Sequence, residues 1–269
     1  MELRDELALR GMRYARRRAE DGVAEVGRIT LMIGDVLRSF VPAMRSFGLV
    51  VQQMQAIGVG SLGLVTVVSL FTGAVAAVQA AYQFSTVVPL KYLGAVILRS
   101  VVIELGPVLT ALVVGGRVGA SIAAELGTMK VTEQVDALRA MAINPVRYLV
   151  VPRILAALVM LPVVTVFANA IAIFGGYVVS ITSIGVSTHT YVVGLKQFFY
   201  LKDVLSGLIK ALVFGGIIGT MGCHFGFTTE GGAEGVGRAT TRAVVASCVL
   251  VLISDYILAT VLFRFIFPT

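Results

Sequence analysis

Charged residues are scarce in this sequence. Asp, Glu, Lys and Arg make up 14% of its 269 residues, and 57% of the residues are hydrophobic. Soluble domains carry roughly 25% charged residues, and a soluble protein of this size could not bury so much apolar surface. Three stretches contain no charged residue, and each is long enough for the roughly 20 apolar residues that cross a bilayer: 46–90, 154–195 and 211–229. The shortage of charge therefore predicts an all-α integral membrane protein.

The sequence also lacks the residue patterns of most enzymes. Its two cysteines, Cys223 and Cys248, show neither the spacing of a metal site nor a disulfide framework. His189 and His224 are isolated from each other and from the cysteines. There is no G-x-x-x-x-G-K-[ST] phosphate loop and no plausible hydrolytic triad. We therefore expect no catalytic residue, no metal and no cofactor in this chain.

Basic residues are unevenly distributed, and their distribution predicts the orientation in the membrane. The net charge is +7, and seven arginines fall in the first 28 residues, mixed with acids. No short apolar core with a cleavage site follows, so no signal peptide is predicted. No basic groove motif points to nucleic acid. Because Lys and Arg are retained on the cytoplasmic side, residues 1–25 are predicted to be a cytoplasmic segment.

Apolar periodicity predicts one interfacial helix followed by about five spans. Apolar residues recur at helical spacing through 26–56, with charges between them, as in a helix lying in the interface plane. An ordinary packed helix is the alternative. Pro162 should bend or locally unwind the third span. The C-terminus then lies outside, after an outer loop and a Gly-rich inner loop. The spans are predicted at about 59–84, 94–123, 151–176, 204–225 and 241–266, and the loops at 177–203 and 226–240.

The second predicted span carries a carboxylate, Glu104. If Arg117 lies near the inner interface, Glu104 is thirteen residues, or about 20 Å, further out along the helix. That depth is in the outer half of a hydrocarbon core about 30 Å thick, and Pro107 should bend the span nearby. An intramembrane charge indicates either a polar wall of a substrate cavity or a hydrogen bond between helices.

Small residues follow Glu104 at spacings of three and four, which lets two helices approach closely, either within the chain or in a dimer. After them, residues 129–143 have the pattern of a short surface helix. Thr128 can cap its start, and Asn144-Pro145 ends it. Such a helix is either a docking element or a solvated connector. The small residues are Gly115, Gly116, Gly119, Ala120, Ala123 and Ala124.

Two further charges lie in the predicted fourth and fifth spans. Lys210 and Asp255 are each about 22 to 23 residues from the centre of the inner loop, so both should reach the same depth. We predict a structural ion pair between them, because each charge alone would be costly in the bilayer. The alternative is that the lysine extends to the outer interface.

The stretch ELGPVLTALVVGGRVGASIAAELGTMKVTEQVDALRAMAINP (104–145) resembles the signature of the MlaE/YrbE permeases, and GRATTRAVV (237–245) is similar to that family too. The resemblance covers 26–269 and implies one permease domain. These permeases are homodimeric membrane subunits of ABC transporters, with ATP and Mg²⁺ bound by a cytoplasmic ATPase. The family also implies a periplasmic MCE-protein ring, in some systems a STAS-domain protein, and a lipid substrate, usually a phospholipid. The implied location is the bacterial inner membrane.

The resemblance also implies two sets of site residues. In the family, the surface helix after the second span couples to the ATPase, and an outward-facing lipid pocket is built from the first two spans. Ile103 departs from the pattern, because a family member has arginine there. The implied coupling residues are Gly127, Thr128, Met129, Glu133, Gln134, Asp136, Ala137 and Leu138, and the implied lipid-binding residues are Ala76, Gln79, Gln83, Phe84, Val87, Glu104 and Leu105.

Two other functions remain open from the residues themselves. Glu104, Lys210 and Asp255 could form the ion path of an autonomous channel or carrier. The chain could instead be a membrane scaffold that carries nothing. Co-purification with an ATPase, and lipid flux that requires ATP, would favour the permease.

Overall fold

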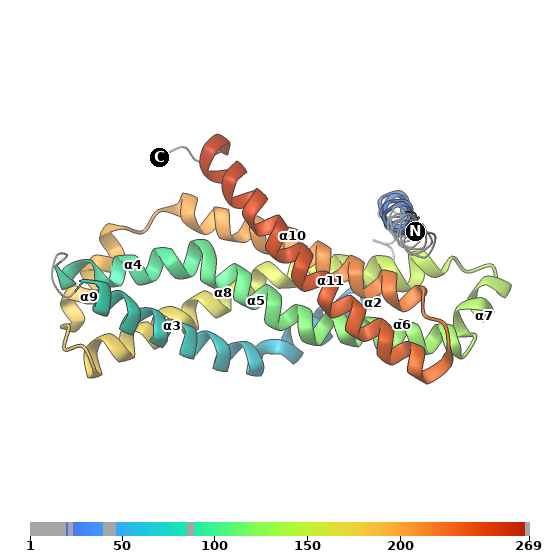
Figure 1. Ribbon diagram of the computed structural model, residues 1–269, viewed down its shortest axis with the longest axis horizontal. Helices are drawn as coiled ribbons and strands as arrows, with labels where there is room; N and C mark the ends of the chain where they lie inside the picture. The colour runs from blue at the N-terminus through green and yellow to red at the C-terminus, as the bar shows by residue number, and fades with distance from the viewer. Residues whose placement is uncertain (1–19, 21–23, 40–46, 85–88, 267–269) are drawn as a thin grey trace, which may run out of the picture.

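The computed structural model describes residues 20, 24–39, 47–84 and 89–266, and the regular elements in these ranges are helices, with no strand. The long helices run along the long axis of the molecule (Figure 1). Five helical segments are long and apolar enough to cross a membrane, which agrees with the predicted fold class. They are Phe47–Phe84, Leu90–Val131, Val146–Thr182, Leu201–Phe227 and Gly232–Arg264.

Each segment is built from consecutive helical elements. The first comprises α2 (Phe47–Ile57), η2 (Val59–Ser61) and α3 (Leu62–Phe84); the second comprises η3 (Leu90–Tyr92), α4 (Leu93–Ser100), η4 (Val101–Leu105), α5 (Gly106–Val114), η5 (Gly115–Gly119) and α6 (Ala120–Val131). Then follow α7 (Gln134–Ala140), η6 (Val146–Val150), α8 (Val151–Thr182), α9 (Thr188–Gln197), α10 (Leu201–Phe227), α11 (Gly232–Val261) and η7 (Leu262–Ile266).

The start of the first apolar segment differs from the prediction. A single interfacial helix was expected over 26–56, with the span beginning near residue 59. In the structure, residues 24–39 are helical, and α2 joins α3 through the short turn η2. α2 packs against α8, and Val50 and Ile57 are buried. One face of α2 is therefore covered by protein, and α2 forms part of the first apolar segment.

Glycines bring α3 and α8 into backbone contact. A Cβ atom on Gly73 would lie 1.7 Å from the carbonyl oxygen of Ala172, and one on Gly175 would lie 2.3 Å from that of Leu70. Real Cβ atoms never approach so closely, so only glycine fits at either position. These two helices form the most extensive contact in the bundle.

The two prolines of the spans behave differently. Pro107 is the second residue of α5, which follows the π-helical turn η4. A π turn widens the helix and accommodates a proline that has no N–H to donate. Pro162 lies inside α8, which continues without interruption from Val151 to Thr182. The helix is therefore not unwound at Pro162, whereas the predicted bend stays a prediction.

The connections between the later spans are more helical than predicted. The expected outer loop over 177–203 contains the end of α8 and all of α9, whose start is capped by the Ser187 hydroxyl, which accepts from Thr190 N–H. The expected inner loop over 226–240 shrinks to a turn between α10 and α11. Gly231 and Gly232 have φ of +89° and +66°. Glycine reverses the chain in few residues because it adopts such angles without strain.

α11 crosses the other long helices obliquely (Figure 1). Its buried positions recur at every fourth residue, and most of them are small. It contacts α10, α6, η5 and α5. The buried positions are Gly235, Ala239, Ala243, Ser247 and Val251.

Candidate functional site

Three charged side chains from three segments meet inside the bundle. Lys210 of α10 is completely buried, and its Nζ donates a hydrogen bond to Oε2 of Glu104 in η4. The same Nζ lies 2.9 Å from Oδ1 of Asp255 in α11, at ion-pair distance but without the alignment of a hydrogen bond. The structure thus places the two residues of the predicted pair side by side. It adds Glu104 as a second carboxylate partner, which the depth argument had not paired with Lys210.

The approach of α10 to the second span explains how Lys210 reaches Glu104. A Cβ atom on Gly207 would lie 2.3 Å from the carbonyl oxygen of Val102, so the two backbones touch one helical turn before Lys210. Val102 belongs to η4, whose wider turn also carries Glu104. Glycine and the π turn together bring the buried ammonium to the carboxylate.

The members of this cluster differ in exposure. The side chain of Lys210 is fully buried, that of Asp255 is 15% exposed and that of Glu104 is 43% exposed. A buried ion is stabilised only when partners replace its lost water. Lys210 and Asp255 therefore depend on each other, whereas Glu104 also faces open space.

The space that Glu104 faces is a cavity of about 590 Å³ beside the N-terminal half of the second span, at the end that is predicted to be the outer one. Sites for small ligands typically have volumes of about 300–1,000 Å³ and mostly apolar walls. Glu104 and Arg99 supply the two charges of this cavity, and the remaining walls are mainly apolar and aromatic. The lining residues are Tyr92, Ala95, Val96, Arg99, Ser100, Ile103, Glu104 and Phe198.

The residues implied as lipid-binding do not line one cavity within this chain. Gln79 lines a second cavity of about 470 Å³ between α3 and α8, with apolar neighbours. Leu105 lines neither of these two cavities. Ala76 and Phe84 are partly buried on α3, whereas Gln83 is exposed. Val87 lies outside the described residues.

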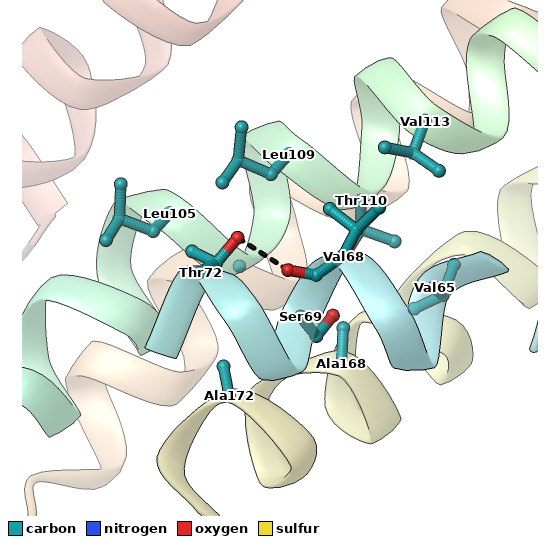
Figure 2. A pocket seen from close by; sticks show the side chains of 11 residues that line it. Val65, Val68, Ser69, Thr72, Leu105, Leu109, Thr110, Val113, Ala168 and Ala172 are labelled. Carbon is teal, nitrogen blue, oxygen red and sulfur yellow. Dashed lines mark hydrogen bonds between the residues drawn. The ribbon is translucent and has the colours of Figure 1, made fainter. Parts of the chain in front are cut away.

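Leu105 points instead into the seam between α3, α5 and α8 (Figure 2). The space there measures about 10 Å³, which is about the room of one water molecule. In Figure 2 the Thr72 hydroxyl donates to the carbonyl oxygen of Val68 in its own helix, at 2.8 Å. Its polar group is therefore satisfied locally, and the seam is packing rather than a ligand site.

The surface helix after the second span is shorter than predicted. α6 continues through Thr128 to Val131, and the chain reverses at Thr132 and Glu133 before α7 begins. Thr128 does not cap this helix, because it lies inside α6, and the residue before α7 is Glu133. Glu133 has a φ of +60°, in the left-handed region. Asn144 caps the following helix, since its side-chain oxygen accepts from Val146 N–H at 2.9 Å.

α7 lies at one end of the bundle, opposite α9 (Figure 1). Of its residues only Val135 is buried. Asp136 pairs with Lys130 at 3.1 Å and with Arg139 at 2.9 Å, and the hydrogen bond from Lys130 holds the pKa of this exposed carboxyl below its usual value. Of the residues implied in coupling, Gly127 is buried; Met129 and Leu138 are partly buried; and Thr128, Glu133, Gln134, Asp136 and Ala137 are exposed.

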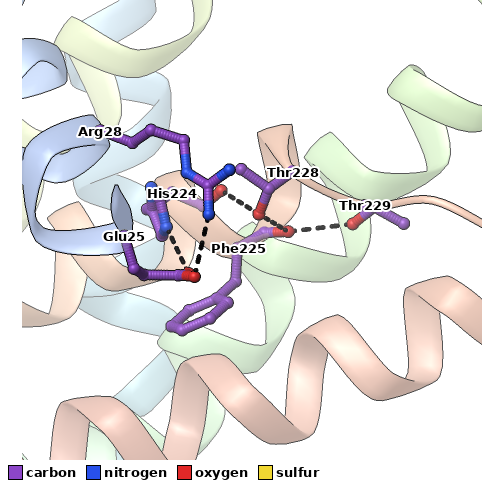
Figure 3. A network of polar contacts seen from close by, with 6 residues as sticks. All are labelled: Glu25, Arg28, His224, Phe225, Thr228 and Thr229. Carbon is purple, nitrogen blue, oxygen red and sulfur yellow. Dashed lines mark hydrogen bonds and ion pairs between the residues drawn. The ribbon is translucent and has the colours of Figure 1, made fainter. Parts of the chain in front are cut away.

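A second polar network joins the N-terminal helix to the bundle (Figure 3). Glu25 lies 2.9 Å from Nε2 of His224 near the C-terminal end of α10, and Arg28 donates to the same carboxylate at 3.1 Å. The hydrogen bond with His224 is the largest cause of a lowered pKa at Glu25. Glu25 and His224 are 199 positions apart, so no local pattern could have revealed this contact.

Arg117 also has a defined structural role. Its guanidinium donates to the Ser61 hydroxyl at 2.9 Å and to the carbonyl oxygen of Ala56 at 3.3 Å. A Cβ atom on Gly60 would lie 2.6 Å from the same guanidinium. Arg117 therefore ties η5 to the junction of α2 and α3. Among the described residues, no group of three or more His, Cys, Asp and Glu side chains could hold a metal ion.

The small residues after Glu104 pack largely within the chain. Gly115 and Gly119 face Ile218 of α10. Ala123 is buried, and Gly226 lies against its backbone. A Cβ atom on Gly116 would meet nothing within 4 Å. Close packing between α6, η5 and α10 accounts for most of this pattern.

Comparison with known proteins assigns the family. The model of the family described as "Permease MlaE" matches residues 50–261. The chain belongs to the MlaE permease family. It is 43% identical over 239 residues to "Probable ABC transporter permease protein RT0041" of Rickettsia typhi, covering 89% of this chain and 92% of that protein.

Relatives in photosynthetic organisms extend the comparison. "Probable ABC transporter permease protein slr1045" of Synechocystis is 41% identical over 213 residues, 79% of this chain and 81% of that protein. "Protein TRIGALACTOSYLDIACYLGLYCEROL 1, chloroplastic" of Arabidopsis thaliana is 34% identical over 236 residues, 88% of this chain and 67% of that protein. This MlaE-family chain is thus a multi-pass membrane permease subunit.

Proposed function

We propose that this permease is the membrane subunit of an ATP-driven transporter that moves lipid between the inner and outer membranes. ATP and Mg²⁺ are bound by a cytoplasmic ABC ATPase, and the substrate is a phospholipid. The chain works as a homodimer in the bacterial inner membrane, with the N-terminus in the cytoplasm and the C-terminus in the periplasm. A periplasmic MCE-protein ring receives or delivers the lipid, and a STAS-domain protein binds inside in some systems.

The exposed end of α7 is the observation that carries the ATPase part of this proposal. The left-handed backbone at Glu133 turns the chain back, so α7 stands apart from α6 with only Val135 buried. Met141, at its C-terminal end, is 62% exposed. An exposed apolar side chain among charges, outside the apolar segments, is what an interface with a soluble partner requires. The names of the bacterial relatives point to an ABC partner of this kind.

The outer cavity supports the lipid part. Its volume of about 590 Å³ and its mainly apolar walls suit an acyl chain and part of a headgroup. Several large apolar side chains of α3, Phe71 and Val75 among them, are also exposed, as expected of a surface that faces lipid. The Arabidopsis relative carries the name of a lipid, trigalactosyldiacylglycerol, which favours a diacylglycerol-based substrate.

A coupling variant tests the proposal. Glu133→Asn removes the carboxylate before α7, and Met141→Asp replaces the exposed apolar side chain after it; the two substitutions are combined in one variant. Asn tolerates the left-handed backbone at position 133, so the fold should survive. We expect the ATPase to be lost on co-purification and ATP-dependent lipid transfer from proteoliposomes to stop.

The matched control is Val193→Asp on α9, at the opposite end of the bundle, where Val193 is 44% exposed. This variant should keep both the ATPase and the lipid transfer. A coupling variant that retains the ATPase and a normal turnover would remove the coupling assignment.

An ion-coupled carrier is the second candidate, because Glu104, Lys210 and Asp255 form a continuous charged chain from the cavity to α11. The two functions differ in their energy source. Lipid transfer that needs ATP and persists without an ion gradient supports the permease, whereas transport driven by an ion gradient in the absence of any ATPase supports the carrier. A scaffold would show neither.

A further inference from the structure

A cationic rim adjoins the outer cavity. Arg99 and Tyr92 line the cavity, and Lys91, Lys202 and Tyr200 lie next to them and complete the rim. Lys91 Nζ lies 5.0 Å from the centroid of the Tyr92 ring, and Tyr92 lines the cavity. Arg99 Cζ and Lys202 Nζ each lie 5.8 Å from the centroid of Tyr200. Three cations are thus gathered over two tyrosines at one side of the cavity.

We propose that this cationic rim selects the headgroup of the transported lipid, and that the lipid is a glycerophospholipid with a net negative headgroup. The inference rests on the proposed lipid transport and assigns a role to residues outside the implied lipid-binding set. The occupant places its phosphate at Arg99 and an acyl chain along the apolar wall near Val96.

Arg99 has the geometry for a phosphate. Its Nε donates to Oδ2 of Asp203 at 3.0 Å, and Asp203 is 5% exposed. This ion pair holds the guanidinium by its inner edge and leaves the two terminal nitrogens for a bidentate contact, which is the geometry that arginine uses with phosphate. The side chain of Arg99 is 43% exposed and lines the cavity.

The depth of Arg99 matches a lipid phosphate. Arg99 precedes Arg117 by eighteen residues, or about 27 Å of helix, close to the thickness of about 30 Å of the hydrocarbon core. Lys91 is eight residues further out, at the level of the headgroups. Tyrosines and lysines are common at this level as anchors, and here Tyr92 and Arg99 also line the cavity.

The two ends of the cavity differ in the sign of their net charge: the rim is positive and the inner end is negative. The rim carries three cations and one buried carboxylate, Asp203, which pairs with Arg99. At the inner end, Glu104 and Asp255 share one ammonium, that of Lys210. An anionic headgroup is therefore attracted at the rim and repelled at the inner end, so it stays outside while the acyl chain enters. An uncharged galactose headgroup would gain nothing from this arrangement.

Photocrosslinking tests the proposal. The full-length permease in nanodiscs carries p-benzoylphenylalanine in place of Val96, which lines the cavity and is 36% exposed. Alkyne-tagged phosphatidylglycerol, phosphatidylcholine and monogalactosyldiacylglycerol with identical acyl chains are compared. We expect phosphatidylglycerol to be captured about tenfold more than the galactolipid, as suits a charge-assisted phosphate contact.

Arg99→Gln should bring the three captures within about twofold of each other, because the bidentate contact is lost. Lys196→Gln is the matched control, since Lys196 is an exposed outer cation on α9 that does not line the cavity. It should leave the tenfold preference intact. Equal capture of all lipids by the unchanged protein, or an equal effect of both substitutions, would overturn the proposal.

Two further measurements distinguish headgroup selection from a folding defect and from binding of free phosphate. Arg99→Gln strands the buried Asp203 and could disturb folding, so Lys91→Gln, which leaves no buried carboxylate unpaired, should reduce the preference by about threefold on its own. Millimolar inorganic phosphate or glycerol phosphate should not displace the lipid; displacement would show a site for free phosphate. If no lipid probe is captured at position 96, the proposed lipid transport is refuted. If all lipids are captured without a headgroup preference, only the role of the cationic rim is refuted.

Discussion

Replacing Lys210 by methionine should destabilise the permease more than any other single change in the intramembrane cluster. Methionine is nearly as long as lysine and fills the same buried space, so the substitution removes charge with little change in volume. It leaves Glu104 and Asp255 without their shared cation. Breaking a buried ion pair by removing one partner costs about 3–5 kcal/mol.

The two carboxylates should contribute unequally to this loss of stability, because they differ in solvent exposure. Glu104 is 43% exposed to the cavity and can be hydrated, whereas Asp255 is only 15% exposed. Most of the loss should therefore arise at Asp255. We expect a loss of about 3 kcal/mol for Lys210→Met and about 1 kcal/mol for Asp255→Asn, because Lys210 then keeps its hydrogen bond to Glu104.

The decisive measurement is the double variant. Lys210→Met with Asp255→Asn should be about 1 kcal/mol more stable than Lys210→Met alone, since the stranded charge is gone. Lys210→Met with Glu104→Gln should recover less, because Glu104 has access to water. Unfolding in SDS can be followed by labelling of Cys223, which is fully buried, in a Cys248→Ser background. Losses that simply add, or a larger recovery through Glu104→Gln, would refute this reasoning.

Three further predictions concern the frame of the molecule. Gly73→Ala should lower stability by about 2 kcal/mol or more in the same SDS assay, because the new Cβ would overlap the carbonyl oxygen of Ala172. Gly63→Ala is the control, because a Cβ there meets nothing within 4 Å, and it should leave stability unchanged or raise it. The hydrogen bond from His224 lowers the pKa of Glu25, so its contribution to docking of the N-terminal helix is complete above the ordinary Glu pKa and disappears as the pH falls through the lowered value. Spin labels at Leu31 and Thr241 should give a sharp distance distribution at pH 7 that broadens in acid. In the Glu25→Gln variant the distribution should already be broad at pH 7. If neither change alters the distribution, the contact between Glu25 and His224 does not hold the N-terminal helix on the bundle. Ser187→Ala should cost about 1 kcal/mol through the lost cap of α9, and a stability equal to that of Thr188→Ala would argue against capping.

The sequence predicted the number and type of the spans because both follow from composition. Long stretches without charge must be helical in a bilayer, so the five segments were visible without any contact information. The shared depth of Lys210 and Asp255 could likewise be counted from the turn between α10 and α11. Their contact with Glu104 could not, because it depends on how close Gly207 lets α10 approach the second span.

The ends of elements were predicted less well, since they depend on tertiary contacts. Thr128 has the type of a cap but lies inside α6, and the chain turns at Glu133, a residue that seldom takes a left-handed backbone. Arg99 was not among the site residues predicted from the sequence. Its pairing with Asp203 spans 104 positions and leaves no periodic trace.

The spacing of buried residues along α11 has a mechanical consequence. A stripe repeated every four residues drifts around a helix with 3.6 residues per turn, so the helix that carries it must cross its neighbours at an angle. α11 therefore acts as a diagonal brace that touches α6, η5, α5 and α10 at successive heights. Sliding α10 along the second span would break the contacts of α11 with one of these two partners. The brace keeps Glu104, Lys210 and Asp255 level with one another even when the charges between them are removed.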